Sequence, residues 1–350
     1  MSDRGGIGVA IVMVSVSAVA CFLPLLAMGQ TAPDGWTLPR TLNGQPDLQG
    51  VWANNVATPL ERPTELADRK FLTDEEVAAL QTQATALFDG NGAAAFGDSV
   101  FLAALAEVQD YKSTDGQTGN YNSFWLVDRD FDNRTSLITD PPDGRLPAVT
   151  SEAAIKAAAA TAAGRQRPAG PEDLTVSLRC ITPGVPNLFA GYNSYYQIVQ
   201  TPRYVAIATE MYHDVRVIPL DGGPHLSPAL RQWNGDSRGH WEGDTLVVDT
   251  TNLVDQGGTG RTRFRLSASE NLHLVERFTR LGPNTLNYEF TIDDPTTWSA
   301  PWTAMISLKR SEDSLYEFAC HEGNRSMSGI LAGNRIQERA AADATETATP

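Results

Sequence analysis

The sequence has few cysteines and lacks the short motifs that mark common cofactor and metal sites. Its 3 cysteines show no C-x-x-C spacing, which falls short of a zinc signature. No G-x-G-x-x-G or P-loop occurs, so nucleotide cofactors have no support, and no H-E-x-x-H marks a catalytic metal. Nucleophilic chemistry at Ser237 is not expected either. We therefore expect neither a cofactor nor a bound metal.

Basic side chains are also scarce, and the chain is strongly acidic. Asp and Glu number 42 against 27 Lys and Arg, which gives a formal net charge of −15. A field of that sign repels phosphate backbones and anionic membranes. We expect a small molecule as the partner, not nucleic acid or a membrane surface. The composition leaves the oligomeric state open.

The N-terminus is typical of a bacterial export signal. An apolar run over residues 7–27 leads to small residues and a cleavage site after Gly29. The run is nearly long enough to remain as a membrane anchor, and Cys21 offers a faint lipoprotein signal. Pro24 and the small-residue exit favour cleavage. We therefore expect residues 1–29 to be removed and the mature protein to be periplasmic or secreted.

Export bears on the two cysteines that remain after cleavage. Two thiols in an exported chain predict a disulfide between Cys180 and Cys320. The bond would close a loop of about 140 residues, for which chain entropy gives at most about 5 kcal/mol. The alternative is a thiolate or metal site, with ligands drawn from His213, His225, His321 and Glu322.

Turn and periodicity signals divide the mature chain into a mixed N-terminal region and a β-rich domain. Residues 30–170 predict an extended arm, helices and a hairpin that pack on the β domain of 171–335, and 336–350 predict a disordered tail. The expected helices of the N-terminal region cover 74–88, 94–110 and 151–163, and the hairpin covers 122–147.

Short β-branched and aromatic segments recur about every ten residues beyond Cys180. Gly, Pro, Asp and Asn separate them, which is the rhythm of an antiparallel sandwich or barrel. We expect a mainly β protein of the α+β class, an antiparallel barrel or sandwich with helical N-terminal additions. The predicted strands are 194–201, 204–209, 214–220, 245–253, 272–281, 285–292 and 302–310.

Several longer blocks stand out along the chain. They are DLQGVW (47–52), RTSLITDPPDGRLP (134–147), RCITPGVP (179–186), YYQIVQTPRYVAI (195–207), RVIPLDGGPH (216–225), GDSRGHWEGDTLVVDTTN (235–252), DDPTTWSAPWTA (293–304) and CHEGN (320–324). Together these blocks resemble a family of exported bacterial proteins. The resemblance covers about 47–335 and implies an exported, β-rich protein, but it brings no activity and no catalytic residues. The Gly-x-Trp at 50–52 also gives a looser likeness to lipocalin-type barrels.

Histidines near strand ends are the first candidates for chemistry. On a strand, His213 shares a face with Val215 and Val217, so an outward Asp214 and Arg216 would turn His213 inward. It would then act as a general base, or as a core histidine bonded to a carbonyl. His321 and Glu322 would be held in register by the neighbouring disulfide. His240 and His273 are expected at the surface.

The stretch 231–252 combines three Asp, one Glu, two Arg, one His and two Trp with three glycines. It is either a rigid turn or the rim of a pocket, in which Asp236 or Glu242 would transfer protons. The candidate catalytic residues are His213, His321, Asp236, Glu242 and Glu322, and the candidate substrate-binding residues are Arg216, Arg238, Trp241, Trp298, Trp302 and Tyr196.

Two classes of function fit these patterns. The first is a cofactor-independent lyase, isomerase or hydrolase that acts on a small organic metabolite by acid–base chemistry. The second is a lipocalin-like protein that binds a small molecule without changing it. An enzyme requires histidines and carboxylates converging in one cavity. A carrier would have a mostly apolar cavity, with its polar groups satisfied at the surface.

Overall fold

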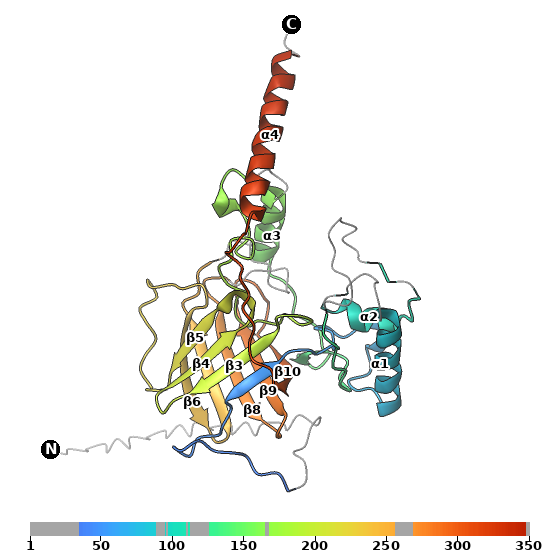
Figure 1. Cartoon of the computed structure of the whole chain (residues 1–350), viewed down its shortest axis with the longest axis vertical. Helices are drawn as coiled ribbons and strands as arrows, with labels where there is room; N and C mark the ends of the chain where they lie inside the picture. Colours follow the sequence, from blue (N-terminus) through green and yellow to red (C-terminus); the bar gives the residue numbers. More distant parts are fainter. Residues whose placement is uncertain are drawn as a thin grey trace, which may run out of the picture.

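A computed structural model gives the fold (Figure 1). The predicted export signal, 1–29, lies outside the described residues. No helix within the described ranges is both long enough and apolar enough to span a bilayer. The structure describes residues 35–88, 95, 97–109, 111–112, 126–164, 168–255 and 269–347.

One large antiparallel sheet dominates the described part of the chain (Figure 1). Its strands run in the order β5-β4-β3-β1-β10-β9-β8-β7-β6, and β2 pairs with β10 outside this path. The strands are β1 (Gly50–Ala53), β2 (Ile138–Asp140), β3 (Tyr195–Gln200), β4 (Tyr204–Thr209), β5 (Val215–Pro219), β6 (Asp236–Glu242), β7 (Thr245–Thr251), β8 (His273–Arg280), β9 (Thr285–Asp293) and β10 (Trp302–Ser311).

Strict alternation of side chains gives this sheet one buried face. Strands β8 and β9 alternate between partly exposed and buried positions along their length. The buried set includes Trp52, Leu246, Phe290 and Trp302, which join one core cluster. Strand β1 lies between β3 and β10, with Trp52 opposite Tyr196 on one side and Arg310 on the other. The core therefore fills the concave side of the sheet.

The sheet is curved but not closed. Strands β5 and β6 are its two ends in the hydrogen-bonding order. They nevertheless meet through side chains, because a Cβ on Gly239 of β6 would lie 2.8 Å from Ile218 Cγ2 and 2.7 Å from Leu220 Cδ2. The expected mainly β fold is confirmed, whereas a closed barrel is not supported. We call the side-chain contact between β5 and β6 the seam.

Two helices form a small separate layer beside the sheet (Figure 1). Helix α1 (Asp74–Phe88) and helix α2 (Ser99–Leu105) share an apolar cluster that contains Leu80 and Phe101. The start of α1 is fixed by a capping box, in which the Thr73 N–H donates to Glu76 at 2.8 Å and the Glu76 N–H donates to Thr73 at 3.3 Å.

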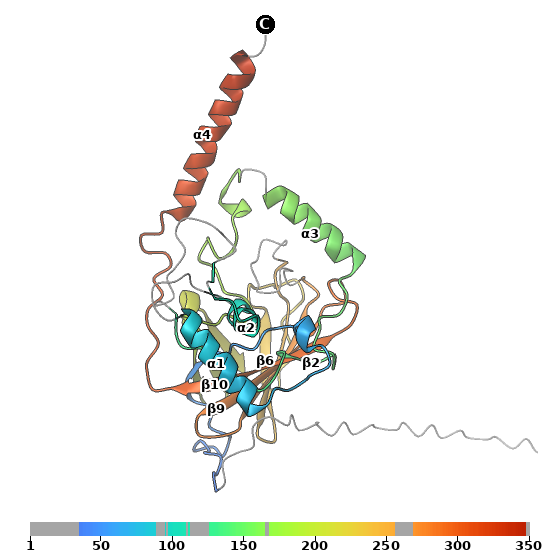
Figure 2. The ribbon, with the colours of Figure 1, turned by 90° about the vertical axis from the view of Figure 1, so that its right-hand side faces the viewer.

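Two further helices lie at one end of the molecule (Figures 1 and 2). Helix α3 (Ser151–Gly164) confirms the alanine-rich helix. Helix α4 (Ser326–Thr347) extends away from the sheet, so most of the segment expected to be a disordered tail is helical. The expected hairpin over 122–147 is absent from its described part, 126–147, where β2 pairs with β10 instead.

Candidate functional site

A small cavity lies on the concave side of the sheet. Its volume is about 30 Å³, enough for about two water molecules. Apolar side chains from five strands make up most of the wall, and the loop 183–187 covers one side. The lining residues are Pro183, Gly184, Val185, Asn187, Tyr196, Ile198, Ile207, Thr209, Asp214, Arg216, Asn234, Glu276, Phe278, Tyr288 and Leu308.

A charged pair lies inside this apolar wall. Arg216 of β5 forms a bidentate ion pair with Glu276 of β8. Its Nη1 donates to Oε2, and its Nη2 donates to Oε1 at 2.8 Å. The exposed fractions of the two side chains are 12% and 1%. The Tyr288 hydroxyl donates to the same carboxylate at 2.7 Å. Three polar groups from three strands therefore satisfy one another within the core.

The electrostatics of this group keep its members in defined states. Burial opposes the charge on Arg216, but attraction and hydrogen bonding to Glu276 outweigh burial and raise the pKa of Arg216. Burial, and then the charge of Glu276, raises the pKa of Tyr288 well above its ordinary value. Arg216 therefore stays a cation, and Tyr288 stays a neutral hydrogen-bond donor.

A second polar group, around Asp214, lies in the cavity wall. Thr182 and Asn234 both donate to Asp214 Oδ2, and the Gly184 N–H donates to the Thr182 hydroxyl at 3.0 Å. At the other end of the loop, the Tyr196 hydroxyl donates to the Asn187 carbonyl. The loop 183–187 is therefore pinned at both of its ends.

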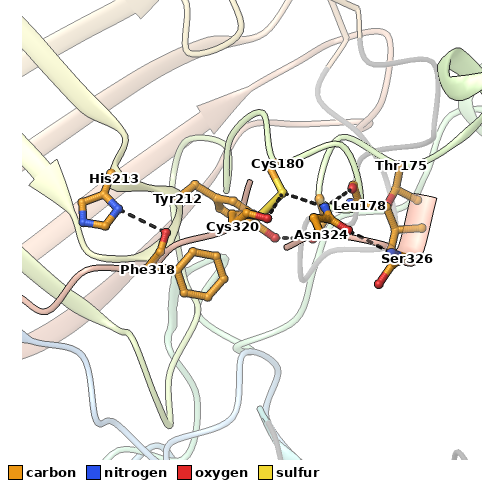
Figure 3. Close-up of a disulfide and its surroundings, with 10 residues drawn as sticks. Thr175, Leu178, Cys180, Tyr212, His213, Phe318, Cys320, Asn324 and Ser326 are labelled. Carbon is orange, nitrogen blue, oxygen red and sulfur yellow. Dashed lines mark hydrogen bonds between the residues drawn. A yellow bond between two sulfur atoms is a disulfide. The ribbon is translucent and has the colours of Figure 1, made fainter. Parts of the chain in front are cut away.

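The predicted disulfide between Cys180 and Cys320 is confirmed (Figure 3). The Cα atoms of Cys180 and Cys320 are 5.7 Å apart. Phe318 contacts the turn before Asp214, because its ring lies edge-on to Tyr212 with centroids 5.2 Å apart and its carbonyl is 3.2 Å from His213 Nδ1. The segment around Cys320 is therefore held by the disulfide to Cys180 and by the contacts of Phe318 with the turn at 212–213.

The face assigned to His213 from the sequence is wrong. His213 is exposed in a 3-10 turn, Met211–His213 (η4), with φ of 51°. Strand β5 begins only after it, and Val215 and Val217 are 54% and 58% exposed. Asp214 and Arg216 face the cavity instead. The Arg216–Glu276 pair explains the reversal, because a buried partner allows the charged residues to take the inner face.

The remaining predicted catalytic residues do not reach the cavity. His321 and Glu322 are exposed in the loop before α4. Glu242 is exposed on the outer face of β6, where it contacts His240 at 3.1 Å and Arg277 at 2.7 Å. These contacts lower the pKa of Glu242, with Arg277 as the larger cause.

Among the predicted binding residues, Arg216 and Tyr196 line the cavity, and the three tryptophans do not. Trp298 and Trp302 are core residues, 6% and 1% exposed. Trp241 packs on the core from β6, and no protein acceptor within the described ranges lies near its buried Nε1. A stacking role for these rings would require the core to open.

The charged stretch 231–252 forms the β6–β7 hairpin, not an isolated turn. Residues 235–239 spell G-x-S-x-G, the spacing of a nucleophile elbow, which needs a sharp strand-to-helix turn. Ser237 lies inside β6 instead, 5% exposed, with its hydroxyl 2.8 Å from that of Thr250. The motif therefore places no nucleophile here.

Histidines and carboxylates do converge, but on the outer face of β6, β7 and β8. His225 lies between two carboxylates, with Nδ1 at 2.9 Å from Asp236 and Nε2 at 2.8 Å from Asp249. The other oxygen of Asp249 is 2.7 Å from His273 Nε2. Arg238 Nε is 3.4 Å from Asp236. We call His225, Asp236, Asp249 and His273 the His–Asp chain.

Hydrogen bonds link the members of the His–Asp chain. Both ring nitrogens of His225 face carboxylates. Burial disfavours the charge on Asp236, yet hydrogen bonds from the Leu226 N–H and from His225, with the charge of Arg238, lower its pKa. Asp249 lies between two imidazoles, with one oxygen near His225 Nε2 and the other near His273 Nε2.

Several important residues gave little or no signal in the sequence. Glu276 was detectable, because it occupies an apolar position of an alternating strand between Leu274 and Phe278. Asp249, Thr182 and Asn234 carry no such signal, since their partners come from distant segments. In the described ranges, no set of three or more His, Cys, Asp or Glu residues is arranged to hold a metal ion.

Comparison with known proteins adds no assignment. The chain matches no protein-family model, no curated protein and no solved structure. What the cavity and the His–Asp chain do must therefore be argued from their own geometry.

Proposed function

We propose that this is a small-molecule binding protein that holds its ligand in the interior cavity. The observation that carries the proposal is the buried Arg216–Glu276–Tyr288 group inside a mostly apolar wall. Well-packed apolar residues of similar volume often stabilise a core as well as a buried ion pair does. A few polar groups set into an apolar pocket are also the usual composition of a ligand site.

The placement of the histidines supports binding over catalysis. His213 and His321 are exposed, and His225 and His273 belong to the His–Asp chain on the outer face. The cavity itself is mostly apolar and contains no histidine. This is the arrangement expected of a carrier, whose polar side chains are satisfied outside its pocket.

Ligand entry requires the loop 183–187 to move. The cavity volume of about 30 Å³ is far smaller than that of a typical ligand pocket. The loop is held by hydrogen bonds at Thr182 and Asn187, both of which can exchange for water or ligand contacts. We propose that the loop swings outward and that the ligand extends from the cavity toward the space the loop vacates.

The cellular location that we propose is outside the cytoplasm. The support is the apolar N-terminal stretch with its small-residue exit at Gly29, together with the Cys180–Cys320 disulfide. Disulfides persist in oxidising compartments and are rare where thiols are kept reduced. A carrier of environmental metabolites would suit such a compartment.

Native mass spectrometry tests the proposal. The purified protein is incubated with mixed glycosides, terpenoids and aromatic metabolites, and ligands are identified after release. We expect unaltered retention by the wild type and its loss in Val185→Trp, which fills the cavity from the loop. The matched control is Val217→Trp on the outer face of β5, which should retain ligand. Equal retention by both variants would exclude the cavity as the site.

An acid–base enzyme is the second candidate, and the His–Asp chain favours it. If His273 Nε2 donates to Asp249, its Nδ1 is left as a proton acceptor on a side chain that is 43% exposed. The same screen detects turnover as new product masses. His273→Asn should abolish any turnover, whereas His240→Asn, outside the His–Asp chain, should not. Product formation that survives His273→Asn would exclude this site.

A further inference from the structure

We propose that the cavity ligand carries a hydrogen-bond-donating head group, an amine or a hydroxyl rather than a carboxylate, and that this group binds Asp214. The inference rests on the proposed binding function and specifies its ligand class. Three features of the wall lead to it: an unused oxygen, the balance of charge, and the aromatic rings.

The first feature is an unused acceptor on Asp214, which lines the cavity. Asp214 Oδ2 accepts hydrogen bonds from Thr182 and Asn234. Across the described residues, Oδ1 of the same carboxylate receives no hydrogen bond, although Asp214 lines the cavity. A carboxylate oxygen is an acceptor only. Its natural complement is therefore an N–H or O–H group of a ligand.

The second feature is the charge of the wall. Arg216 is its one cation, and Asp214 and Glu276 are its two anions, so the lining carries a formal charge of −1. Both Nη atoms of Arg216 already contact Glu276, which removes the paired donors that a ligand carboxylate would need. The whole chain carries a formal charge of −15. A ligand carboxylate would be repelled at long and short range.

The third feature is the set of rings around the cavity. Tyr196, Phe278 and Tyr288 line it, and the last two are stacked with centroids 4.7 Å apart. The face of an aromatic ring attracts a cation. A protonated amine near Asp214 would therefore gain from both the carboxylate and the rings, whereas a hydroxyl would gain from the carboxylate alone.

A matched series of ligands tests this order. Calorimetry and ligand-detected NMR at pH 7 compare hexylamine, hexan-1-ol and hexanoate, which share one chain and differ in head group. For the wild type we expect the amine to bind most tightly and the alcohol next. The Kd of hexanoate should be at least about tenfold higher than that of the amine. Hydrogen exchange should report opening of the loop 183–187 with each bound probe.

Two variants separate a local effect from net charge. Asp214→Asn should bring the amine and the alcohol to within about threefold of each other. Asp221→Asn removes the same charge from a side chain that is 54% exposed and outside the cavity, so the wild-type order should persist. Equal changes in both variants would overturn the role of Asp214.

The wild-type measurements decide the proposal even if Asp214→Asn does not fold. Tightest binding by hexanoate, or equal binding by all three probes, overturns the head-group inference while the cavity remains a ligand site. Failure of every probe to bind, or binding that Val185→Trp leaves unchanged, overturns the proposed function together with the inference.

Discussion

Arg216 in β5 and Glu276 in β8 form an ion pair, although five strands separate β5 from β8 in the sheet order. The contact spans the inside of the curved sheet. Removing one partner from a buried pair typically costs about 3–5 kcal/mol, because the other charge is left uncompensated. We expect Arg216→Met and Glu276→Leu each to lose stability on that scale, measured by urea unfolding at pH 7.

The double variant and a surface pair serve as controls for this first prediction. Arg216→Met combined with Glu276→Leu should be more stable than either single variant, since no buried charge remains unpaired. Breaking the exposed Arg40–Asp244 pair should cost about 0–1 kcal/mol. A double variant as unstable as the sum of the singles would contradict the pairing.

The disulfide gives a second prediction. Replacing Cys180 and Cys320 together by Ala should lower stability by about 2–5 kcal/mol, because the open chain gains entropy when unfolded. Thermal unfolding with and without a dithiol reductant measures the effect. The wild type should lose Tm on reduction, and the double variant should show no response. A reductant-insensitive wild type would mean that the bond adds nothing.

Asp294 gives a third prediction, on pH. This 3% exposed carboxylate accepts bonds from the Ser269 N–H and hydroxyl and from the hydroxyls of Thr296 and Thr297. Burial raises its pKa, but these bonds outweigh burial and the net pKa is lowered. Its stabilising contribution is therefore fully present above the ordinary value of about 3.9 and is lost as the pH falls through the folded value.

Urea midpoints between pH 7 and pH 2 measure that contribution. Asp294→Asn should be about 1–3 kcal/mol less stable at pH 7 and should show a shallower acid limb. Its neighbour Asp293 is only partly buried, so Asp293→Asn should keep the wild-type profile. An unchanged acid limb in Asp294→Asn would assign the acid sensitivity to other carboxylates.

The seam gives a fourth prediction. Gly239→Val would place side-chain atoms against Ile218 and Leu220, which already lie within 2.8 Å of a Cβ at that position. Overpacking of this kind costs about 1–3 kcal/mol. Gly333→Ala in α4 meets nothing within 4 Å and should raise helix stability slightly. A neutral Gly239→Val, measured by urea unfolding, would show that the two sheet ends separate without cost.

Local pattern was sufficient for most of the sheet. The alternation in β8 and β9 and the turn residues between them depend only on neighbouring positions, and these strands form where they were expected. Strand β6 was missed because glycines and charges dominate it, and its order comes from pairing with β7. The open seam was not predictable, since it depends on how far a ten-stranded sheet curls.

The candidate site was less accessible to sequence reasoning. Arg216 and Tyr196 were identified, but the face of β5 was inverted because an acid and an arginine were assumed to point to solvent. A buried glutamate sixty residues later reversed that choice. Glu276 at an apolar position of β8 was the available clue. No local sequence pattern predicts the contact between His225 and Asp249, because the fold of a loop and a hairpin brings the two residues together.

The position of β1 between β3 and β10 determines the order in which the molecule is completed during translation. About 250 residues separate the end of β1 from the start of β10, so at about 5–20 residues per second the ribosome needs roughly 10–50 s to supply the missing neighbour. Until then the earliest strand has one side unpaired. A nascent chain of this topology reaches its native state only after nearly all of it has been synthesised.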